Sequence, residues 1–413
     1  MRQTFEIPLD IPDVMIEKVE TGRNGDFVIT VKSTVEYTYC HKCGKKITKV
    51  YGYDREITLR HLAILGRKTY IRLRPVRYQC PSCDGNPTTT QQLSWYITRS
   101  SYTKAYEEHI LLGLVNSTVQ DGCIKEEIGY EAIMGIIDRH IQGEVDWDQF
   151  SRLEVVGLDE IALKKGHGNF VTIVTGHLGH ETVILGVLPD RKKTTVKAFL
   201  AGIPQKLRKT IKAVCSDMYE GFISAAKEVL GTHVKVVMDR FHVAKLSRKG
   251  LEVLRKQERK RLKRALPKEE YKQLQGVMWV LRKKGENNTE EDKDLLERLF
   301  VHSPRLKVAY DLCNTLTGVF DKHIMKRKAK YQLKSWIKNV RDSGLQCFDT
   351  FLTTLEKWMD EIANYFITRQ TSGFVEGLNN KIKVIKRRCY GIVNTKHLFQ
   401  RIHLDLSGYS VFA

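Results

Sequence analysis

Three acidic residues lie where side chains from distant parts of the chain could act on one ligand. Asp159 follows the apolar run VVGL, Asp217 ends the run IKAVCSD, and Glu376 lies in the segment TSGFVEGLNN. Magnesium prefers carboxylate oxygens and keeps several waters, so a few such residues can hold two ions and leave room for a phosphate. Two ions about 3.5–4 Å apart activate the attacking oxygen and stabilise the leaving oxygen. This chemistry, with Mg²⁺ or Mn²⁺, needs no Ser, Cys or His nucleophile.

The elements that must position the first two carboxylates lie between residues 155 and 239. Apolar and alternating patterns predict strands at 155–159, 169–175, 181–187, 211–217 and 234–239, with helices near 193–201 and 218–230. This order matches a ribonuclease-H-like sheet, in which strands one and four are neighbours. Asp159 and Asp217 would then meet at the carboxyl ends of adjacent strands, where α/β sheets present residues for chemistry. Asp239 ends the fifth strand, which lies one strand further from the first strand than the fourth strand does.

Each aspartate also has a purely structural interpretation. Asp159 could simply end a strand. Asp217 begins the capping-box-like sequence Asp217-Met-Tyr-Glu220, and Asp239 could cap the next helix in the same way. Taken singly, Asp217 and Asp239 are better explained as caps than as ligands, and only the set of Asp159, Asp217 and Glu376 favours chemistry.

Glu376 belongs to a predicted amphipathic helix. An apolar stripe at spacings of three and four comprises Val375, Leu378, Ile382 and Ile385. Glu376, Asn379, Asn380 and Lys383 therefore share another face of that helix. An ordinary solvated face is the simpler interpretation, but two adjacent Asn are poor helix formers, which indicates that this face has a task.

Two CxxC pairs indicate a metal site near the N-terminus. Cys40 and Cys43 form one pair, Cys80 and Cys83 the other, and each is followed closely by a glycine. Two intervening residues let both thiolates face one tetrahedral ion, and four thiolates leave no open position. We therefore predict one structural Zn²⁺ in a zinc ribbon, with 47–53 and 67–80 as its extended hairpin. A redox pair would need only one CxxC.

The next segment has the pattern of a helix-turn-helix. A helix is expected at 102–117, a short one at about 119–127, a turn at 128–130 and an amphipathic helix at about 131–141. The last would enter the major groove of DNA. Any αα-hairpin looks similar, however, and the exposed face of that helix carries Glu131 and Asp138 beside Arg139.

The charge of the chain indicates a polyanionic partner. Lys and Arg number 69 against 48 Asp and Glu, a net charge of +21, which favours nucleic acid. Basic residues recur throughout the chain, which disfavours a membrane surface. The expected DNA contacts are Arg67, Lys68, Arg72, Arg139, Arg259, Lys260, Lys326, Arg327, Lys383, Lys386 and Arg387. Such runs are often only solvated faces.

Asp217 and Glu376 are 159 positions apart, so a further segment must separate the fifth strand from the Glu376 helix. Residues 240–366 have helical periodicity throughout, which predicts an all-α insertion. Its basic stretches are 255–268 and 322–336. Trp279 and Trp336 could stack on an unpaired base, but core packing is the better interpretation of both.

The blocks GLDEIALKKGH, VCSDMYEGF, MDRFHV and SGFVEGLNNKIKVIKRRCYG resemble those of DDE transposases from bacterial insertion sequences, within them the ISL-three family. The resemblance covers nearly the whole chain. It implies a triad of Asp159, Asp217 and Glu376 on a ribonuclease-H-like fold, recognition of terminal inverted repeats, cleavage to free 3′-hydroxyls, and strand transfer into target DNA. Asp239 and His242 match a further block of the family, and no catalytic position is missing.

We therefore expect a multidomain protein. The expected domains are a zinc-binding domain at 1–100, a helix-turn-helix at 101–150, a ribonuclease-H-like catalytic core at 151–240 and 367–413, and the helical insertion at 241–366. No signal peptide or membrane span is evident, so a cytoplasmic, nucleoid-associated protein acting as a homo-oligomer is expected. The alternatives are a zinc-containing DNA-binding regulator without activity, and a nuclease of the same fold that does not join strands.

Overall fold

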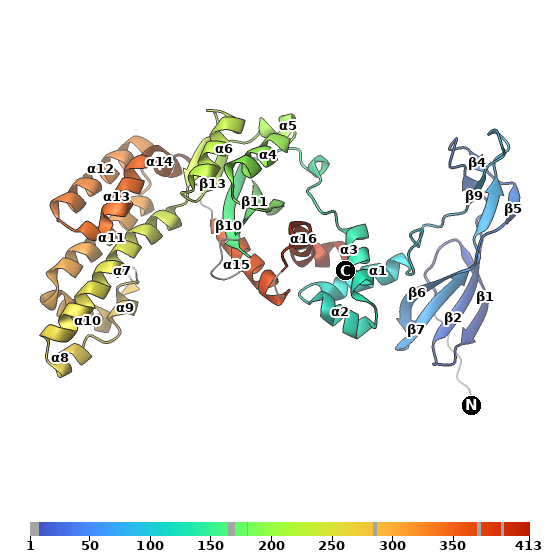
Figure 1. The fold of residues 1–413 in the computed structure, drawn as a ribbon, viewed down its shortest axis with the longest axis horizontal. Coiled ribbons are helices and arrows are strands. Elements are labelled where there is room, and N and C mark those ends of the chain that lie inside the picture. The colour runs from blue at the N-terminus through green and yellow to red at the C-terminus, as the bar shows by residue number, and fades with distance from the viewer. Residues whose placement is uncertain (1–7, 164–169, 180, 284–286, 370–372, 390–391) are drawn as a thin grey trace. The chain divides into compact units, whose positions relative to one another are not determined.

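The structure is a computed structural model of the chain that describes residues 8–163, 170–179, 181–283, 287–369, 373–389 and 392–413. The chain divides into two compact units, one formed by Met1–Ile141 with His403–Ala413 and the other by Gln142–Ile402 (Figure 1). Within the described residues, no helix is both long and apolar enough to cross a membrane.

The first unit begins with small β-sheets. Its strands are β1 (Val14–Thr21), β2 (Phe27–Ser33), β3 (Thr38–Tyr39), β4 (Lys46–Ile47), β5 (Val50–Tyr53), β6 (Ile57–Ile64), β7 (Arg67–Leu73), β8 (Val76–Gln79) and β9 (Thr88–Thr90). The sheets have the orders β1-β2-β7-β6, β3-β4 and β5-β8-β9. The largest buries a core that includes Ile29, Leu59, Ile71 and Trp95.

The predicted long hairpin strand at 67–80 is wrong in one respect. It is divided into β7 and β8, which belong to different sheets. The break falls at Arg74–Pro75, between Leu73 and Val76. Proline has no N–H for a ladder hydrogen bond, so a continuous central strand cannot run through this position. Only β8 pairs with β5, as the ribbon hairpin requires.

Helices complete the first unit. They are α1 (Lys104–Leu114), α2 (Val119–Glu126), α3 (Tyr130–His140) and the end of α16 (Thr395–Phe412). Thr118 begins α2 with a capping box closed by Asp121, which fixes the start of this short helix. Ile133, Ile136 and Ile137 of α3 are buried against α1, which confirms the predicted apolar stripe. The predicted helix, turn and helix are thus present at 119–140.

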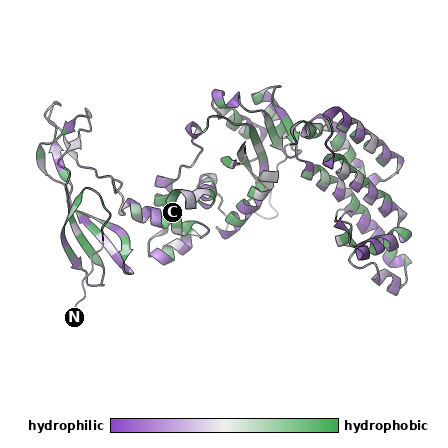
Figure 2. Ribbon diagram, turned by 180° about the vertical axis from the view of Figure 1, so that it is seen from behind, coloured by the Kyte–Doolittle hydropathy of each residue, from purple (hydrophilic) through white to green (hydrophobic). Residues whose placement is uncertain are grey.

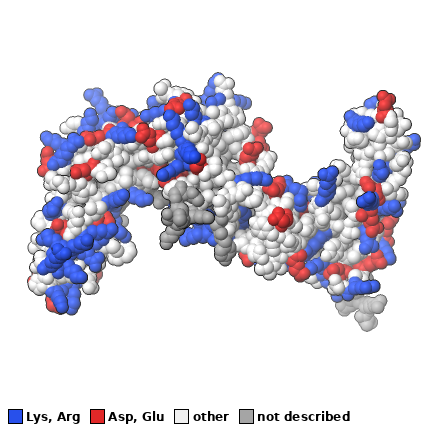
Figure 3. All heavy atoms as spheres, viewed as in Figure 1, with Lys and Arg blue, Asp and Glu red and all other residues white. Residues whose placement is uncertain are grey.

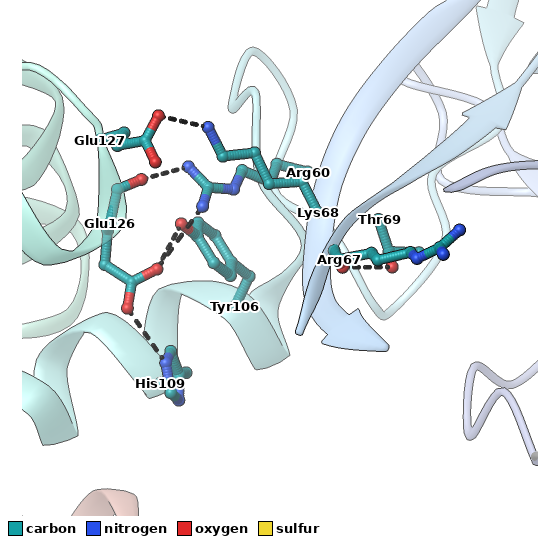
Figure 4. A network of polar contacts seen from close by, with 8 residues as sticks. All are labelled: Arg60, Arg67, Lys68, Thr69, Tyr106, His109, Glu126 and Glu127. Carbon is teal, nitrogen blue, oxygen red and sulfur yellow. Dashed lines mark hydrogen bonds and ion pairs between the residues drawn. The ribbon is translucent and has the colours of Figure 1, made fainter. Parts of the chain in front are cut away.

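A polar network joins the sheet to these helices (Figure 4). The Arg60 guanidinium of β6 lies 4.7 Å over the ring of Tyr106 and donates to the main-chain carbonyl of Glu126. The Tyr106 hydroxyl donates to the Glu126 carboxylate at 2.9 Å. Lys68 of β7 forms an ion pair with Glu127 at 2.6 Å, at the end of α2. Arg60 and Lys68 therefore join the sheet to the end of α2 within this unit.

The second unit is built on a five-stranded mixed sheet. Its strands are β10 (Val155–Ala162), β11 (Phe170–Leu178), β12 (Glu181–Leu188), β13 (Ala213–Ser216) and β14 (Lys235–Met238), in the order β12-β11-β10-β13-β14. The first three are antiparallel, whereas β13 and β14 run parallel to β10. The predicted adjacency of strands one and four is confirmed.

Helices cover both faces of this sheet, because successive strand residues point to opposite sides. One face is covered by α4 (Lys193–Gly202) and α6 (Glu220–Leu230), with the short α5 (Gln205–Arg208) nearby; their cluster includes Val174 and Leu185. The neighbouring residues Ile173 and Ile184 instead pack with Ile382 of α15 and with α16. Figure 1 shows α15 and α6 on opposite sides of β10.

The region after β14 is helical, as predicted. It comprises α7 (Arg240–Ala265), α8 (Lys268–Lys272), α9 (Val277–Val280), α10 (Glu290–His302), α11 (Pro304–Asp321), α12 (Lys326–Asp342), α13 (Asp349–Lys357), α14 (Met359–Thr368) and α15 (Gly373–Arg388). Hydrophobic residues occupy the inward faces of these helices and hydrophilic ones the outward faces (Figure 2). Their core is continuous with that of the sheet, and the Asn364 amide donates to the Val236 carbonyl of β14 at 2.8 Å.

The two tryptophans predicted to lie in this core differ. Trp336 is buried, and its indole N–H donates to the Leu312 carbonyl at 2.8 Å. Trp279 is 64% exposed, so the prediction for it is wrong. The reason is that α9 is a four-residue helix, in which Val277 and Val280 already occupy the buried positions.

Candidate active site and cysteine cluster

Asp159 and Asp217 lie next to each other at one edge of a parallel strand pair. The ladder between β10 and β13 runs from Val155↔Ala213 to Leu158↔Ser216, so each aspartate is the next residue after the last pair. The expectation that Asp159 ends its strand is wrong, because pairing with β11 carries β10 on to Ala162. At Asp159, β10 is therefore paired with β11 but no longer with β13.

The capping interpretation holds for Asp239 but not for Asp217. Helix α6 begins after Tyr219, which makes no side-chain cap, and the Asp217 carboxylate only accepts from the Tyr219 N–H at 3.2 Å. Asp239 is the N-cap of α7 and accepts from the Phe241 N–H at 2.9 Å. The other oxygen of Asp239 lies 3.4 Å from Nδ1 of His242.

Burial and like charge disfavour ionisation of both Asp159 and Asp217. Burial, followed by the charges of Asp159 and Glu160, raises the pKa of Asp217 to about 6. Burial also raises the pKa of Asp159, although the Glu160 N–H and the charges of His242 and Lys383 oppose it. The Asp239 carboxylate, 3.4 Å from Nδ1 of His242, raises the pKa of His242, which favours the imidazolium. The nearby positive charges of the described residues do not offset the effect of burial on the pKa of these two carboxyl groups.

Helix α15 contributes Asn379 to the same place. Its amide N–H donates to Asp159 Oδ2, and the residue is 3% exposed. Among the described residues, the amide oxygen of Asn379 is buried without a hydrogen-bond partner. The third predicted carboxylate, Glu376, falls within the bounds of α15, but its side chain lies outside the described residues.

A cavity of about 710 Å³ surrounds these groups. Its lining includes Asp159, Glu160, Asp217, Asp239, Phe241, His242, Lys245, Arg248, Lys249, Glu252, Arg255, Leu281, Arg282, Asn379 and Lys383. The basic residues Lys245, Arg248 and Lys249 of α7 were missed by sequence reasoning. They lie three, six and seven positions after His242, which places them on one helix face and was the available signal. The cavity thus combines acidic groups with a basic wall.

The donors in this cavity fit a divalent cation. Two half-buried carboxylates with raised pKa and a buried amide oxygen without a partner are the hard oxygen ligands that Mg²⁺ and Mn²⁺ prefer. Within the described part of the chain, however, these acidic groups do not form a cluster of three ligand atoms within 4.8 Å; only the N-terminal cysteines do.

The four predicted cysteines do converge. The sulfur atoms of Cys40, Cys43, Cys80 and Cys83 all lie within 4.8 Å of one another, with Cys40–Cys83 at 4.0 Å and Cys43–Cys80 at 3.8 Å. Tetrahedral zinc with Zn–S bonds of about 2.3 Å requires sulfurs about 3.8 Å apart, whereas a disulfide needs about 2 Å. Hydrogen bonds from the Cys43 and Lys42 N–H groups lower the pKa of Cys40 to about 6, which favours the thiolate that a metal binds.

The backbone of the turns beside these cysteines explains why a glycine follows each CxxC pair. Gly44 has φ 69° and Gly85 has φ 76°, in the left-handed region that glycine adopts without strain. The Gly44 N–H donates to the Cys40 carbonyl at 2.9 Å and closes the first turn.

The predicted DNA contacts fall into two groups. Several are already bonded within the fold: Arg139 to Glu107, Lys68 to Glu127, Arg72 to Glu20 and Glu56, Lys326 to Asn364 and Asp360, and Lys386 to the Ala162 carbonyl. The others are exposed: Arg67, Arg259, Lys260, Arg327, Lys383 and Arg387. The second group is better placed for phosphates than the first.

Comparison with known proteins gives consistent matches. A family model described as a transposase, of the ISL3 (ISL-three) DDE type, matches residues 156–402, and a model described as the zinc-finger of transposases IS204/IS1001/IS1096/IS1165 matches residues 36–83. The chain is 26% identical over 402 residues to the transposase for insertion sequence element IS1001 of Bordetella parapertussis, covering 95% of each chain. It is 22% identical over 423 residues to the transposase for IS1557 of Mycobacterium tuberculosis, covering 97% of this chain and 93% of the relative.

Proposed function

The chain belongs to the ISL3 family of insertion-sequence transposases, and from this premise we propose that it binds the terminal inverted repeats of an insertion sequence and catalyses DNA cleavage and strand transfer. The observation that carries the proposal is the pair Asp159 and Asp217, each of which follows the last paired residue of the parallel ladder between β10 and β13. The set is completed by Glu376 of α15, the helix that already reaches Asp159 through Asn379.

We propose that the catalytic core is ribonuclease-H-like. The support is the strand order β12-β11-β10-β13-β14, three antiparallel strands followed by two parallel ones. The core is then made of 151–240 and 367–413, with 241–366 inserted between the last strand and α15. The inserted helices share one apolar cluster with the sheet, so they hold α7 rigidly beside the carboxylates.

Asp159, Asp217 and Glu376 would hold the divalent ions, and the unpaired oxygen of Asn379 is a further candidate ligand. Such ions, when bound, activate the attacking oxygen and stabilise the leaving oxygen of a phosphodiester. The role of Asn379 is to orient the Asp159 carboxylate through its N–H. His242, Lys383 and the basic residues of α7 would bind the phosphates on either side of the scissile bond.

The N-terminal unit would position the DNA. We propose that residues 1–100 and the helix-turn-helix at 101–150 bind the inverted repeats, with one structural zinc on the four cysteines. Zinc bound to these cysteines would hold the ends of β3 and β8 together, because Cys40 and Cys80 directly follow these strands. Because transposition joins two ends of one element, the active form is expected to be a homo-oligomer.

The test uses a supercoiled plasmid that carries both ends of the encoding element, incubated with the full-length protein and Mg²⁺ or Mn²⁺. Wild type should give strand breaks at the element ends and joined products. Glu376→Gln should reduce cleavage at least about 10³-fold, since removal of a catalytic charge costs several kcal/mol in the transition state. Glu356→Gln is the matched control, because Glu356 is an exposed glutamate paired with Arg341.

Three other outcomes of this test would each support a different conclusion. Undiminished cleavage by Glu376→Gln would mean that Glu376 is not a catalytic carboxylate. Specific binding of the ends without cleavage by wild type would favour the regulator. Breaks without joined products would favour a nuclease.

A further inference from the structure

Trp279 is a large aromatic residue held at the surface. Of the five tryptophans in the chain, it alone is exposed, at 64% of its surface. Val277 and Val280 anchor α9 in the core, and Gly276 begins the helix with φ 86°. The backbone therefore presents the indole outward through a fixed turn.

One arginine lies over this indole, and two others line a cavity beside it. The guanidinium of Arg282 lies over the Trp279 ring, 5.6 Å from its centroid. Trp279 also borders a cavity of about 360 Å³, together with Arg255, Arg259 and Tyr271. Arg259 Nε donates to the Tyr271 hydroxyl at 3.2 Å, which fixes a second aromatic ring at the rim. The floor of this cavity is apolar and includes Leu262, Val277, Leu299 and Leu306.

Two of these three arginines border the cavity of the carboxylates. Arg255 lines both cavities, and Arg282 lines the one that contains Asp159 and Asp217. Arg248 donates to the main-chain carbonyl of Arg282, which ties this loop to α7. Figure 3 shows Lys and Arg side chains gathered over the part of the helical region formed by α7, α8 and α10. Arg282 thus borders both the carboxylate cavity and the exposed indole.

We propose that Trp279, with Arg282, stacks on an unpaired nucleotide of the DNA held in the carboxylate cavity. This assignment rests on the proposed function and deepens it by naming the form of DNA bound. Every base has a π-face, and single strands are held by aromatic side chains within a basic groove. Arginine adds a cation–π contact and a charge for the adjacent phosphate. Bases inside a duplex already stack on each other, so only an unpaired nucleotide meets the indole.

The test compares two DNA probes on the full-length protein by fluorescence anisotropy with Ca²⁺ in place of Mg²⁺. One is a blunt duplex of an element end, and the other carries a short single-stranded extension at the cleavage position. Wild type should bind the extended probe at least about five-fold more tightly, the low end of what stacking of one base contributes. Trp279→Ala should lose this preference and keep its affinity for the blunt duplex, whereas Trp279→Phe should retain part of it.

A second readout places 2-aminopurine in the extension, where stacking on the indole quenches its fluorescence. Quenching should disappear in Trp279→Ala but persist in Tyr331→Ala, the matched control with an aromatic residue that is 75% exposed on α12 of the same helical region. Thermal melting should show that all variants are folded.

The outcomes separate this proposal from the one on which it rests. Equal binding of the two probes by wild type, or a preference that survives in Trp279→Ala, would refute stacking and leave the transposase assignment intact. Loss of blunt-duplex affinity in Trp279→Ala would instead make the indole a general duplex contact and also refute stacking. Failure of wild type to bind either probe would count against the proposed function itself.

Discussion

Replacing Asp217 by Asn should make the metal-free protein more stable at neutral pH while it removes activity. The folded-state pKa of Asp217 is raised from 3.8 to about 6, chiefly by burial and then by the charges of Asp159 and Glu160. The folded state therefore binds more protons than the unfolded state between these values, and the charged carboxylate lowers stability above pH 6. Each pKa unit corresponds to 1.36 kcal/mol, so the penalty at pH 8 is about 3 kcal/mol.

Asparagine cannot ionise, and its side-chain oxygen can still accept from the Tyr219 N–H. Asp217→Asn should therefore raise the free energy of unfolding by about 2–3 kcal/mol at pH 8. For a unit of this size this is a melting temperature about 5 °C higher. The difference should shrink as the pH falls below 6 and vanish below about pH 3, where the wild-type carboxyl is neutral in both states. The assay is thermal unfolding in EDTA at pH 8, 6 and 5.

Asp360→Asn is the matched control with the opposite sign. Asp360 is exposed, and its hydrogen bond to Lys330, with the nearby charge of Lys326, lowers its pKa. Removing this carboxylate should leave stability unchanged or slightly lower it at pH 8. Adding Mn²⁺ should stabilise wild type and not Asp217→Asn. A less stable Asp217→Asn at pH 8, or a gain at pH 5 as large as the gain at pH 8, would show that Asp217 is not destabilised by charge.

Three further predictions concern the metals and DNA. Cys80→Ser should lower bound zinc from about one per chain to none and unfold the ribbon, as metal analysis and proteolysis would show; zinc retained at full stoichiometry would contradict the four-thiolate site. Asn379→Ala should weaken Mn²⁺ binding in the carboxylate cavity about ten-fold or more, because partners that orient a ligand commonly contribute this much, and isothermal titration calorimetry would detect it. Lys383→Ala should weaken DNA binding and reduce its salt dependence, whereas Lys68→Ala should change neither, because Lys68 is already paired with Glu127. Equal losses in the two lysine variants would contradict that distinction.

The sequence by itself determined the features that depend on spacing and periodicity. Two CxxC pairs predicted the zinc cluster, because two intervening residues bring two thiolates to one ion, and the cluster is confirmed. The alternation of strands and helices predicted the adjacency of β10 and β13, and with it the neighbouring positions of Asp159 and Asp217. The resemblance of the motif blocks to ISL3 transposases is likewise confirmed. The ribonuclease-H-like fold, the role of the helix-turn-helix and the role of Glu376 stay predictions.

Only the tertiary structure decided which partner each side chain has. The local sequence pattern predicted that Asp217 caps a helix, yet the N-cap of α6 is Tyr219, two residues later. It counted Arg139 as a DNA contact, yet buried Glu107, thirty-two positions away, binds its guanidinium. It placed Trp279 in the core, yet the valines on either side fill that space. Periodicity reports which face of an element is apolar, but the partner on that face comes from a segment far away in sequence. A polar or aromatic side chain therefore acquires its role only when packing brings that segment to it.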